Sequence, residues 1–481
     1  MLLGKNMRPI PFMAVILLGL FGLLVGPGPE PVKSAPIVAG DVAWMLTATA
    51  LVLLMTPGLS FFYGGMVNRR NVLSTMLQSF AAMGVISLLW VVVGFSLCFG
   101  DSLGGLIGNP ATFFMLRGVG GATHPDLSPT IPLVLFALFQ LKFAIITPAL
   151  ITGSFAERVR FSSYILFMIL FTLVIYPPLA HSTWHPQGFL RQMGVLDFAG
   201  GTVVHMSAGF AALAGAMYLG RRKVHLEGQG HDPANIPFVL LGTGMLWFGW
   251  FGFNAGSALA ANETAALAFL TTNTASAAAM LSWIFFDVAR GGKPTVMGAC
   301  IGAVVGLVAI TPAAGYVTVG ASLFIGSVSS LISNLACHYK GRTNLDDTLD
   351  VFPCHGLGGI VGMLLTGVCA KDVGLLSGHP ATFLSHLVAL AAVGVYTFGG
   401  SYLLYMLTDK LIPLRVDAVE EQQGLDISQH GESLAAWGGV QPVLWQSRPA
   451  AEKLIPGQGM LQSGPGQQSA FDPDGITAHA G

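Results

Sequence analysis

Apolar residues occur along this chain in long windows separated by short polar connections. The hydrocarbon core of a bilayer is about 30 Å thick, so a helix of about 20 apolar residues crosses it. The pattern predicts an all-α membrane protein with eleven transmembrane helices. The expected spans are 41–67, 72–100, 131–155, 162–180, 196–220, 236–258, 263–289, 295–312, 315–339, 349–370 and 383–411.

The charges between these windows predict the orientation of the chain. One set of connections, from Arg69 to Arg415, holds thirteen Lys and Arg residues, and the alternate set holds Arg117, Arg191 and Lys371. Short cytoplasmic loops carry an excess of Lys and Arg. We therefore expect a multi-pass protein of the inner (cytoplasmic) membrane, with its mature N-terminus outside and its C-terminus in the cytoplasm.

The first 35 residues differ from the later spans. Lys5 and Arg8 precede an apolar run from Ile10 to Val25, and a stretch rich in Pro and Gly follows. This order is typical of a secretory signal peptide, which we assign to residues 1–35. An uncleaved extra helix is the alternative interpretation.

The rest of the chain divides by composition into three parts. Residues 36–411 hold all eleven expected spans and form the transmembrane domain. Residues 412–437 are polar and are expected to form an ordered cytoplasmic regulatory tail. Residues 438–481 are rich in Pro, Gly and Gln, and this composition predicts disorder.

Overall composition excludes several classes of protein. Hydrophobic residues make up 53% of the chain and charged residues 9%, whereas a soluble domain has about 25% charged residues. The formal net charge is −1, which gives no reason to expect nucleic acid binding. The five cysteines are scattered without a metal-binding spacing, so we expect no metal, no cofactor and no disulfide framework.

Two histidines lie inside apolar, glycine-rich windows. His205 is in the fifth expected span and His355 in the tenth; Asp197 precedes the first by eight residues, and Asp350 precedes the second by five. A polar side chain in hydrocarbon is costly unless it faces a partner or a cavity. The matching positions predict a five-plus-five inverted repeat with a polar pathway between its halves, and an eleventh span outside. Two satisfied core histidines in unrelated helices are the alternative.

Six stretches, taken together and in order, resemble motifs of the ammonium transporter (Amt/Mep/Rh) family, and of its Amt branch. The resemblance covers about residues 41 to 433. It implies a homotrimer in the lipid bilayer that takes up ammonium, with methylammonium as an analogue. The stretches are FQLKFAIITPALITGSFAERVRF (139–161), LDFAGGTVVHMSAG (196–209), GWFGFNAGSALAANETAALAF (249–269), GACIGAVVGLVAITPAAGY (298–316), DVFPCHGLGGIVG (350–362) and GLDISQHGES (424–433).

The resemblance implies an outer site that recruits ammonium, formed by Phe139, Trp184 and Ser257 with Asp197 beneath them. An aromatic face attracts a cation by about 0.5–2 kcal/mol. For Trp184 taken alone, an anchor at the membrane surface is the alternative. For Asp197 two roles remain open, a helix N-cap or an electrostatic and proton-accepting group.

Below this site the resemblance implies a gate, Phe143 and Phe253, and a pair of pore histidines, His205 and His355. A bare cation in a dry constriction loses its hydration at large cost, and neutral ammonia loses far less. We therefore expect deprotonation near the gate and separate passage of ammonia and proton, with the imidazoles sharing a proton. Lys142 departs from the family pattern, and at helical spacing we expect its side chain to extend away from the pore.

The cytoplasmic tail contains a further motif. Gly424, Asp426, His430 and Gly431 lie in GLDISQHGES, which resembles the family segment that couples the three subunits. Such tails are often contacted by PII-type signalling proteins. Because the family segment couples subunits, we expect the motif to pack against a neighbouring subunit.

Other classes of function remain to be weighed. An ammonium sensor on the same fold is the first alternative, and a Rh-type neutral gas channel is another. A membrane metalloenzyme using His205, His355 and Asp197 lacks a spacing such as HExxH. We therefore expect a transporter and not an enzyme.

Overall fold

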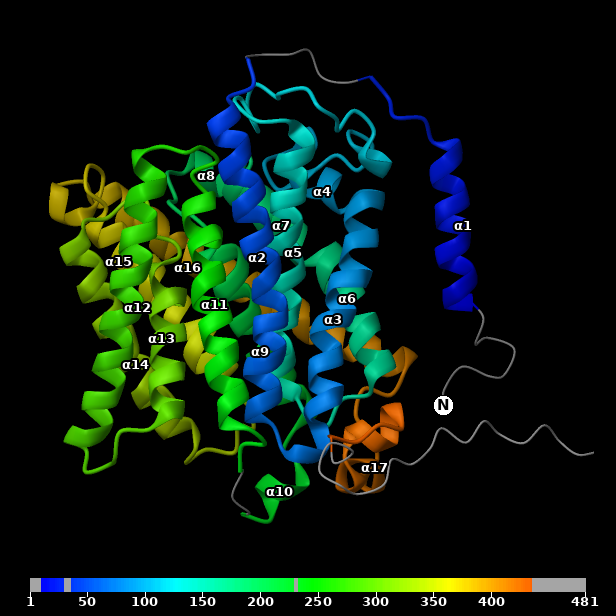
Figure 1. The fold of residues 1–481 in the computed structure, drawn as a ribbon, viewed down its shortest axis with the longest axis vertical. Coiled ribbons are helices and arrows are strands. Elements are labelled where there is room, and N and C mark those ends of the chain that lie inside the picture. The colour runs from blue at the N-terminus through cyan, green and yellow to red at the C-terminus, as the bar shows by residue number, and fades with distance from the viewer. Residues whose placement is uncertain (1–9, 30–35, 229–231, 435–481) are drawn as a thin grey trace, which may run out of the picture. The chain divides into compact units, whose positions relative to one another are not determined.

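The computed structural model describes residues 10–29, 36–228 and 232–434. Helices dominate this part, and the longer ones stand side by side, upright in Figure 1. The α-helices are α1 (Ile10–Leu24), α2 (Ala39–Met66), α3 (Val72–Leu89), α4 (Phe95–Phe99), α5 (Leu133–Phe155), α6 (Phe161–Val174), α7 (Tyr176–Trp184), α8 (Phe189–Gln192), α9 (Ser207–Leu219), α10 (Lys223–Leu226), α11 (Ile236–Gly256), α12 (Glu263–Ala289), α13 (Val296–Ile310), α14 (Val319–Lys340), α15 (Leu357–Cys369), α16 (Pro380–Leu411) and α17 (Ala418–Gln423).

Shorter elements complete the description. A two-stranded antiparallel sheet lies in the loop after α4, and π-helical turns precede or interrupt several helices. The strands are β1 (Ser102–Leu103) and β2 (Ile107–Gly108), the π-helical turns are Trp90–Gly94, Gly201–Met206, Phe352–Gly356 and Asp426–His430, and the 3₁₀ turns are Arg69–Asn71, Phe114–Leu116 and Leu375–Ser377.

Within the described residues, ten helices are long and apolar enough to cross a membrane. The chain is therefore a mostly helical, multi-pass membrane protein. The remaining expected span, 295–312, forms α13, whose 15 residues rise only about 22 Å. The apolar run expected as a signal peptide forms α1. Like α13, it has 15 residues and is shorter than the ten long helices.

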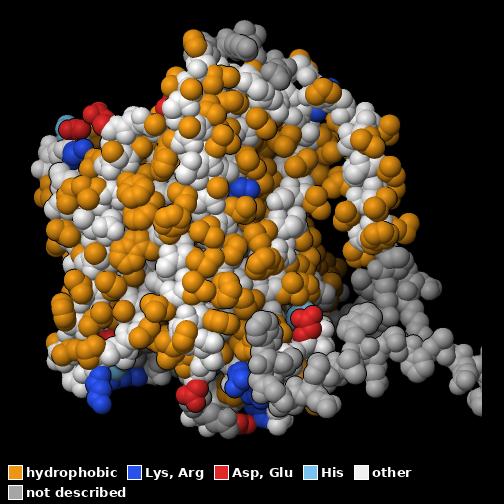
Figure 2. All heavy atoms as spheres, in the orientation of Figure 1, with side chains coloured by type: hydrophobic (Ala, Val, Ile, Leu, Met, Phe, Trp, Pro, Cys, Tyr) orange, Lys and Arg blue, Asp and Glu red, His pale blue; other side chains and the backbone are white. Residues whose placement is uncertain are grey.

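The surface agrees with a lipid environment. On the face drawn in Figure 2 hydrophobic side chains cover most of the middle band, and basic side chains lie at the lower edge. Large apolar side chains such as Phe248, Phe285 and Leu403 are more than half exposed. An apolar surface of this extent is solvated by lipid and not by water.

The two histidine-bearing helices meet through glycine. A Cβ atom added at Gly209 would lie 2.2 Å from the Cα atom of Gly356, so only glycine allows the backbones to approach this closely. His205 lies in the π-helical turn Gly201–Met206 that leads into α9, and His355 lies in the turn Phe352–Gly356 that leads into α15. The repeated glycines of the sequence therefore bring the two histidines together.

The expected tail is described as far as residue 434. It contains α17, which begins with a capping box at Asp417, and the π-helical turn Asp426–His430. The expected disordered segment, 438–481, lies outside the described residues.

Candidate functional site

An open basin of about 470 Å³ lies at the end of the molecule where α7 and α8 are found. Its walls include Phe143, Trp184, Asp197 and Ser257. The ring of Trp184 stands nearly perpendicular to that of Phe143, with centroids 5.7 Å apart, and its Nε1 donates a hydrogen bond to the Asp197 carbonyl oxygen over 3.2 Å. The Ser257 hydroxyl donates to the Phe253 carbonyl oxygen over 2.8 Å. The indole of Trp184 is therefore held in a fixed orientation at the wall of the basin.

Phe139 is placed differently from the other three residues predicted for the outer site. Its side chain is fully buried, and it does not line the basin. Its ring packs edge-on to Phe143, with centroids 5.0 Å apart, and lies so near Gly256 that a Cβ there would be 2.9 Å from it. Phe139 thus supports Phe143 from behind, while Trp184 and Ser257 face the basin.

A stacked pair of phenyl rings closes the floor of the basin. The centroids of Phe143 and Phe253 lie 4.2 Å apart with an interplanar angle of 29°. Phe143 lines the basin above and Phe253 lines a second cavity below. Both side chains are almost completely buried, and the stacked rings lie between the two spaces.

The inner cavity has room for little more than one water-sized molecule. Its volume is about 10 Å³, close to the minimum that holds a single water. Apart from His205 and His355 its walls are apolar. The lining residues are Met55, Leu59, Phe62, Ile146, Leu150, His205, Leu246, Trp250, Phe253, Val304 and His355.

The two histidines lie side by side in this cavity. Their ring centroids are 5.6 Å apart at an interplanar angle of 25°, and the ring of His205 stacks on Trp250 at 5.3 Å. Both ring nitrogens of His205 and the Nδ1 atom of His355 are buried and have no hydrogen-bond partner among the described residues. The proton-sharing hydrogen bond that the sequence suggested is therefore absent from this arrangement. Buried polar atoms without partners are costly, and here they face a space that fits a small molecule able to donate or accept hydrogen bonds.

Asp197 caps the helix that carries the first histidine. Its Oδ1 atom accepts from the backbone N–H groups of Gly200 and Gly201 over 2.8 and 2.7 Å, and its Oδ2 atom accepts from Thr202 over 2.8 Å. Both carboxylate oxygens are thus engaged by the N-terminus of the helix. Of the two roles that the sequence left open, this geometry favours the cap.

Asp347 occupies the equivalent position before His355, and sequence reasoning missed it. Its two carboxylate oxygens accept from the backbone N–H groups of Val351 and Phe352 over 3.1 and 2.8 Å. It lies eight residues before His355, as Asp197 lies eight before His205. Asp350, which the sequence paired with His355, instead adopts a positive φ and forms an ion pair with Lys340. The equal spacing of eight was the signal available in the sequence.

Residues 43–434 of the chain match the family model of the Ammonium Transporter Family. The chain belongs to this family. It is 48% identical over 405 residues to a putative ammonium transporter of Methanothermobacter thermautotrophicus, covering 82% of this chain and 98% of that protein. The crystal structure of Saccharomyces cerevisiae Mep2 matches with a TM-score of 0.75 at 34% identity, covering 80% of this chain and 89% of that one. A structure described as a sensor Amt protein matches with a TM-score of 0.76 at 30% identity, covering 81% and 98%.

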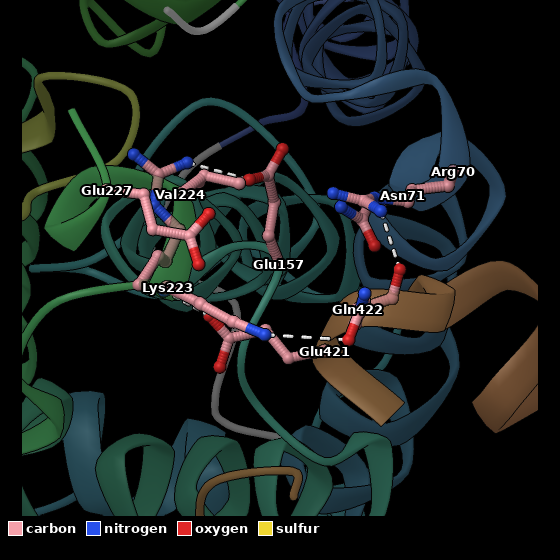
Figure 3. A pocket seen from close by; sticks show the side chains of 9 residues that line it. Arg70, Asn71, Glu157, Lys223, Val224, Glu227, Glu421 and Gln422 are labelled. Atoms are coloured by element: carbon pink, nitrogen blue, oxygen red, sulfur yellow. Dashed lines mark hydrogen bonds and ion pairs between the residues drawn. The ribbon is translucent and has the colours of Figure 1, made fainter. Parts of the chain in front are cut away.

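At the opposite end of the transporter a polar pocket of about 180 Å³ lies between the tail and the loops after α5 and α9 (Figure 3). The guanidinium of Arg222 forms ion pairs with Glu157 at 2.7 Å and with Asp346 at 2.9 Å. Burial alone would raise the pKa of Asp346, but the hydrogen-bonded Arg222 holds the pKa well below its usual range. Arg70 donates to the backbone carbonyl of Gln422 over 2.5 Å, so charged side chains tie the tail to this end of the protein.

The tail motif docks on its own chain at the beginning of α3. The Asp426 carboxylate accepts from the backbone N–H of Ser74 over 2.7 Å, and a ring nitrogen of His430 lies 3.2 Å from the Ser74 hydroxyl. Gly424 and Gly431 have positive φ values of 96° and 70°, which glycine adopts without strain. The four predicted tail residues therefore form one short docked segment. The packing against a neighbouring subunit that the sequence predicted stays a prediction.

Proposed function

This chain transports ammonium, and we propose how its pore does so. Ammonium is recruited in the basin beside Trp184, Phe143 and Ser257, loses a proton at the level of the Phe143–Phe253 pair, and continues as ammonia past His205 and His355. The proton passes separately, so the net result is ammonium uptake. The observation that carries this proposal is the stacked phenyl pair, which separates an open basin from a largely apolar cavity of one-molecule size.

The physical reason is the cost of dehydration. A hydrated cation does not fit in a cavity of about 10 Å³, and a bare cation among apolar side chains pays a large desolvation penalty. In the basin, by contrast, aromatic faces attract the cation and water is still at hand. Ammonia carries no charge, so it is the form of the substrate that the inner cavity accepts.

The histidines give ammonia partners in an otherwise apolar wall. A neutral imidazole has one donor and one acceptor nitrogen, and ammonia can bond to both kinds. The unpartnered nitrogens of His205 and His355 support this role. Because they lie in one small cavity, they also offer the protein groups through which a proton can leave the gate.

The test is current recording on purified protein in lipid, with ammonium, methylammonium and potassium. We expect currents with the first two ions and none with potassium. The variant His205→Leu/His355→Leu should lose its ammonium current, and His338→Leu, at an exposed position of α14, should keep it. An unchanged current in the double variant would refute the proton route.

The same recording separates the two alternatives. A sensor would bind ammonium at the basin yet conduct poorly, and a neutral gas channel would pass ammonia with no current at all. Aromatic recruitment by Trp184 above a phenyl gate favours a site for the cation, which a gas channel does not need. We also propose that no covalent step is catalysed and that no cofactor or metal takes part.

We further propose an assembly and a placement. Ten long spans and the shorter α13 make eleven, arranged as a five-plus-five inverted repeat with α16 outside. The equal spacing of Asp197 to His205 and of Asp347 to His355 supports the repeat. We place the homotrimer in the inner membrane, with the mature N-terminus outside and the C-terminus in the cytoplasm, because the basic loops lie on the side of the tail.

The terminal segments complete the proposal. Residues 1–35 act as a signal peptide, and residues 412–437 form the regulatory tail that a PII-type signalling protein contacts. The charged pocket between tail and loops supports a cytoplasmic docking point. Deleting residues 439–481 should leave uptake and membrane abundance nearly unchanged, and a loss of uptake would show that the regulatory segment extends further.

A further inference from the structure

Two cysteines from separate elements lie together next to the pore. Cys337 is on α14, and Cys354 is in the π-helical turn Phe352–Gly356. Helix α14 packs against this turn, and the two side chains share one apolar cluster with Trp283 and Val305. A hydrogen bond joins the two thiols. The fold therefore pairs two thiols that the transport mechanism does not use.

The pair lies toward the end of the protein opposite the basin. Helix α14 begins just after Tyr316, which lines the basin, and ends at Lys340, three residues beyond Cys337. Cys337 is partly exposed, whereas Cys354 is buried. A small reagent can therefore reach the first thiol, and the second thiol is already in contact with it.

The buried thiol is coupled by the backbone to the inner cavity. Cys354 directly precedes His355, which lines that cavity, and both residues belong to the same π-helical turn. The turn has little room to move, because a Cβ atom added at Gly209 would lie 2.2 Å from the Cα atom of Gly356. Any force on Cys354 is thus transmitted to a histidine in a cavity of only about 10 Å³.

A disulfide between the two cysteines would exert such a force. Its two sulfur atoms lie about 2.05 Å apart, which is closer than the sulfurs of two hydrogen-bonded thiols. Formation of the bond therefore draws Cys354 toward α14 and displaces His355 with it. Disulfides in reducing compartments are mostly transient and redox-sensing, and both cysteines are free in this structure.

We propose that Cys337 and Cys354 are a reversible modification site, at which peroxide forms a disulfide that lowers ammonium transport. Hydrogen peroxide oxidises the Cys337 thiol to a sulfenic acid and leaves as one water molecule. The Cys354 sulfur then attacks the Cys337 sulfur, the S–S bond forms, and the sulfenic oxygen leaves as a second water molecule. Two thiols have then lost two electrons and two hydrogen atoms to one peroxide, and excess small thiol reverses the step by exchange.

The reaction should be slow and its effect should depend on the pore. Thiols in apolar surroundings react slowly, so the site responds to sustained peroxide and not to a brief pulse. The effect on transport rests on the role of His355 in the proposed function, whereas the disulfide itself does not.

The full-length chain in liposomes tests both parts. The protein is incubated with hydrogen peroxide, digested without reduction and mapped by mass spectrometry, and ammonium uptake is measured on the same liposomes. We expect a peptide pair joined through Cys337 and Cys354 that disappears after dithiothreitol. Uptake should fall by about tenfold and recover with dithiothreitol, because a shift of about 1 Å in a positioned group can cost at least that much.

Single variants identify the responsible thiols. Cys337→Ser and Cys337→Ala should keep the uptake of the reduced wild type and lose both the link and the response to peroxide. The matched control is Cys369→Ser, which removes another partly exposed cysteine, at the end of α15, and should keep both.

Three results would overturn the proposal: no linked peptide, a linked peptide with unchanged uptake, or an equal loss of uptake in Cys337→Ser. Reduced wild type that carries no ammonium at all would instead contradict the proposed function, and the peptide map would still decide whether the disulfide forms.

Discussion

Replacing Asp197 by asparagine separates its two proposed roles. Asp197 is the cap of the helix that carries His205, and its carboxylate accepts three short backbone hydrogen bonds and a fourth from Val203 at 3.4 Å. An asparagine keeps one acceptor oxygen and turns an amide N–H₂ toward two backbone donors. We therefore expect Asp197→Asn to lose stability and transport together, through a misplaced His205.

The loss can be estimated from the bonds. A hydrogen bond to a charged group contributes about 1.5–3 kcal/mol, and two such bonds are lost, so the free energy of unfolding should fall by about 3–6 kcal/mol. The matched control is Asp347→Asn. Asp347 caps the other histidine-bearing helix with two backbone hydrogen bonds, whereas Asp197 accepts four. It loses about one bond, so we expect roughly half the effect.

The assay follows thermal unfolding of detergent-purified protein, and uptake normalised to membrane abundance, for wild type and both variants. If Asp197 acts through the cap, transport should fall in step with stability in both variants. If Asp197→Asn keeps its unfolding temperature yet loses transport, and Asp347→Asn keeps both, then Asp197 acts directly on ammonium or its proton and the cap argument is wrong.

Three further predictions concern the two ends of the pore. Trp184→Leu should raise the ammonium concentration for half-maximal flux by about 2- to 30-fold with little change in maximal flux, because a cation–π contact of about 0.5–2 kcal/mol is lost; a collapse of maximal flux would argue for another role. Gly424→Asp should lower uptake without lowering surface abundance, because its φ is 96° and the new Cβ would lie 2.5 Å from the Arg70 side chain; full activity would contradict a regulatory docked tail. Asp346→Asn should cost about 3–5 kcal/mol by leaving Arg222 partly unpaired. Since the folded pKa of Asp346 is lowered, its stabilising contribution is complete above about pH 4 and is lost below it, so the gap in unfolding temperature from wild type should be constant from pH 7 to 5 and narrow at lower pH.

The tertiary structure corrects several details that local patterns could not give. Asp350 is nearest to His355 among the acids before it, yet the cap is Asp347, because a loop that folds back decides which carboxylate meets the helix N-terminus. Phe139 and Phe143 share a helical face in sequence, yet only Phe143 lines the basin. Which of two neighbouring rings faces a cavity depends on packing against other helices, here at Gly256.

By itself the sequence determined the membrane-spanning character, the helical windows, the two histidines and the family. These follow from local properties, because the transfer of a long apolar helix into hydrocarbon is favourable wherever the helix later packs. Only the tertiary structure decided what the polar groups meet: a one-molecule cavity for the histidines, the beginning of α3 for the tail, and no partner within the described chain for Lys142. The reason is physical, since a polar side chain in an apolar medium is stabilised only by the specific group placed beside it, and that neighbour comes from a distant part of the sequence.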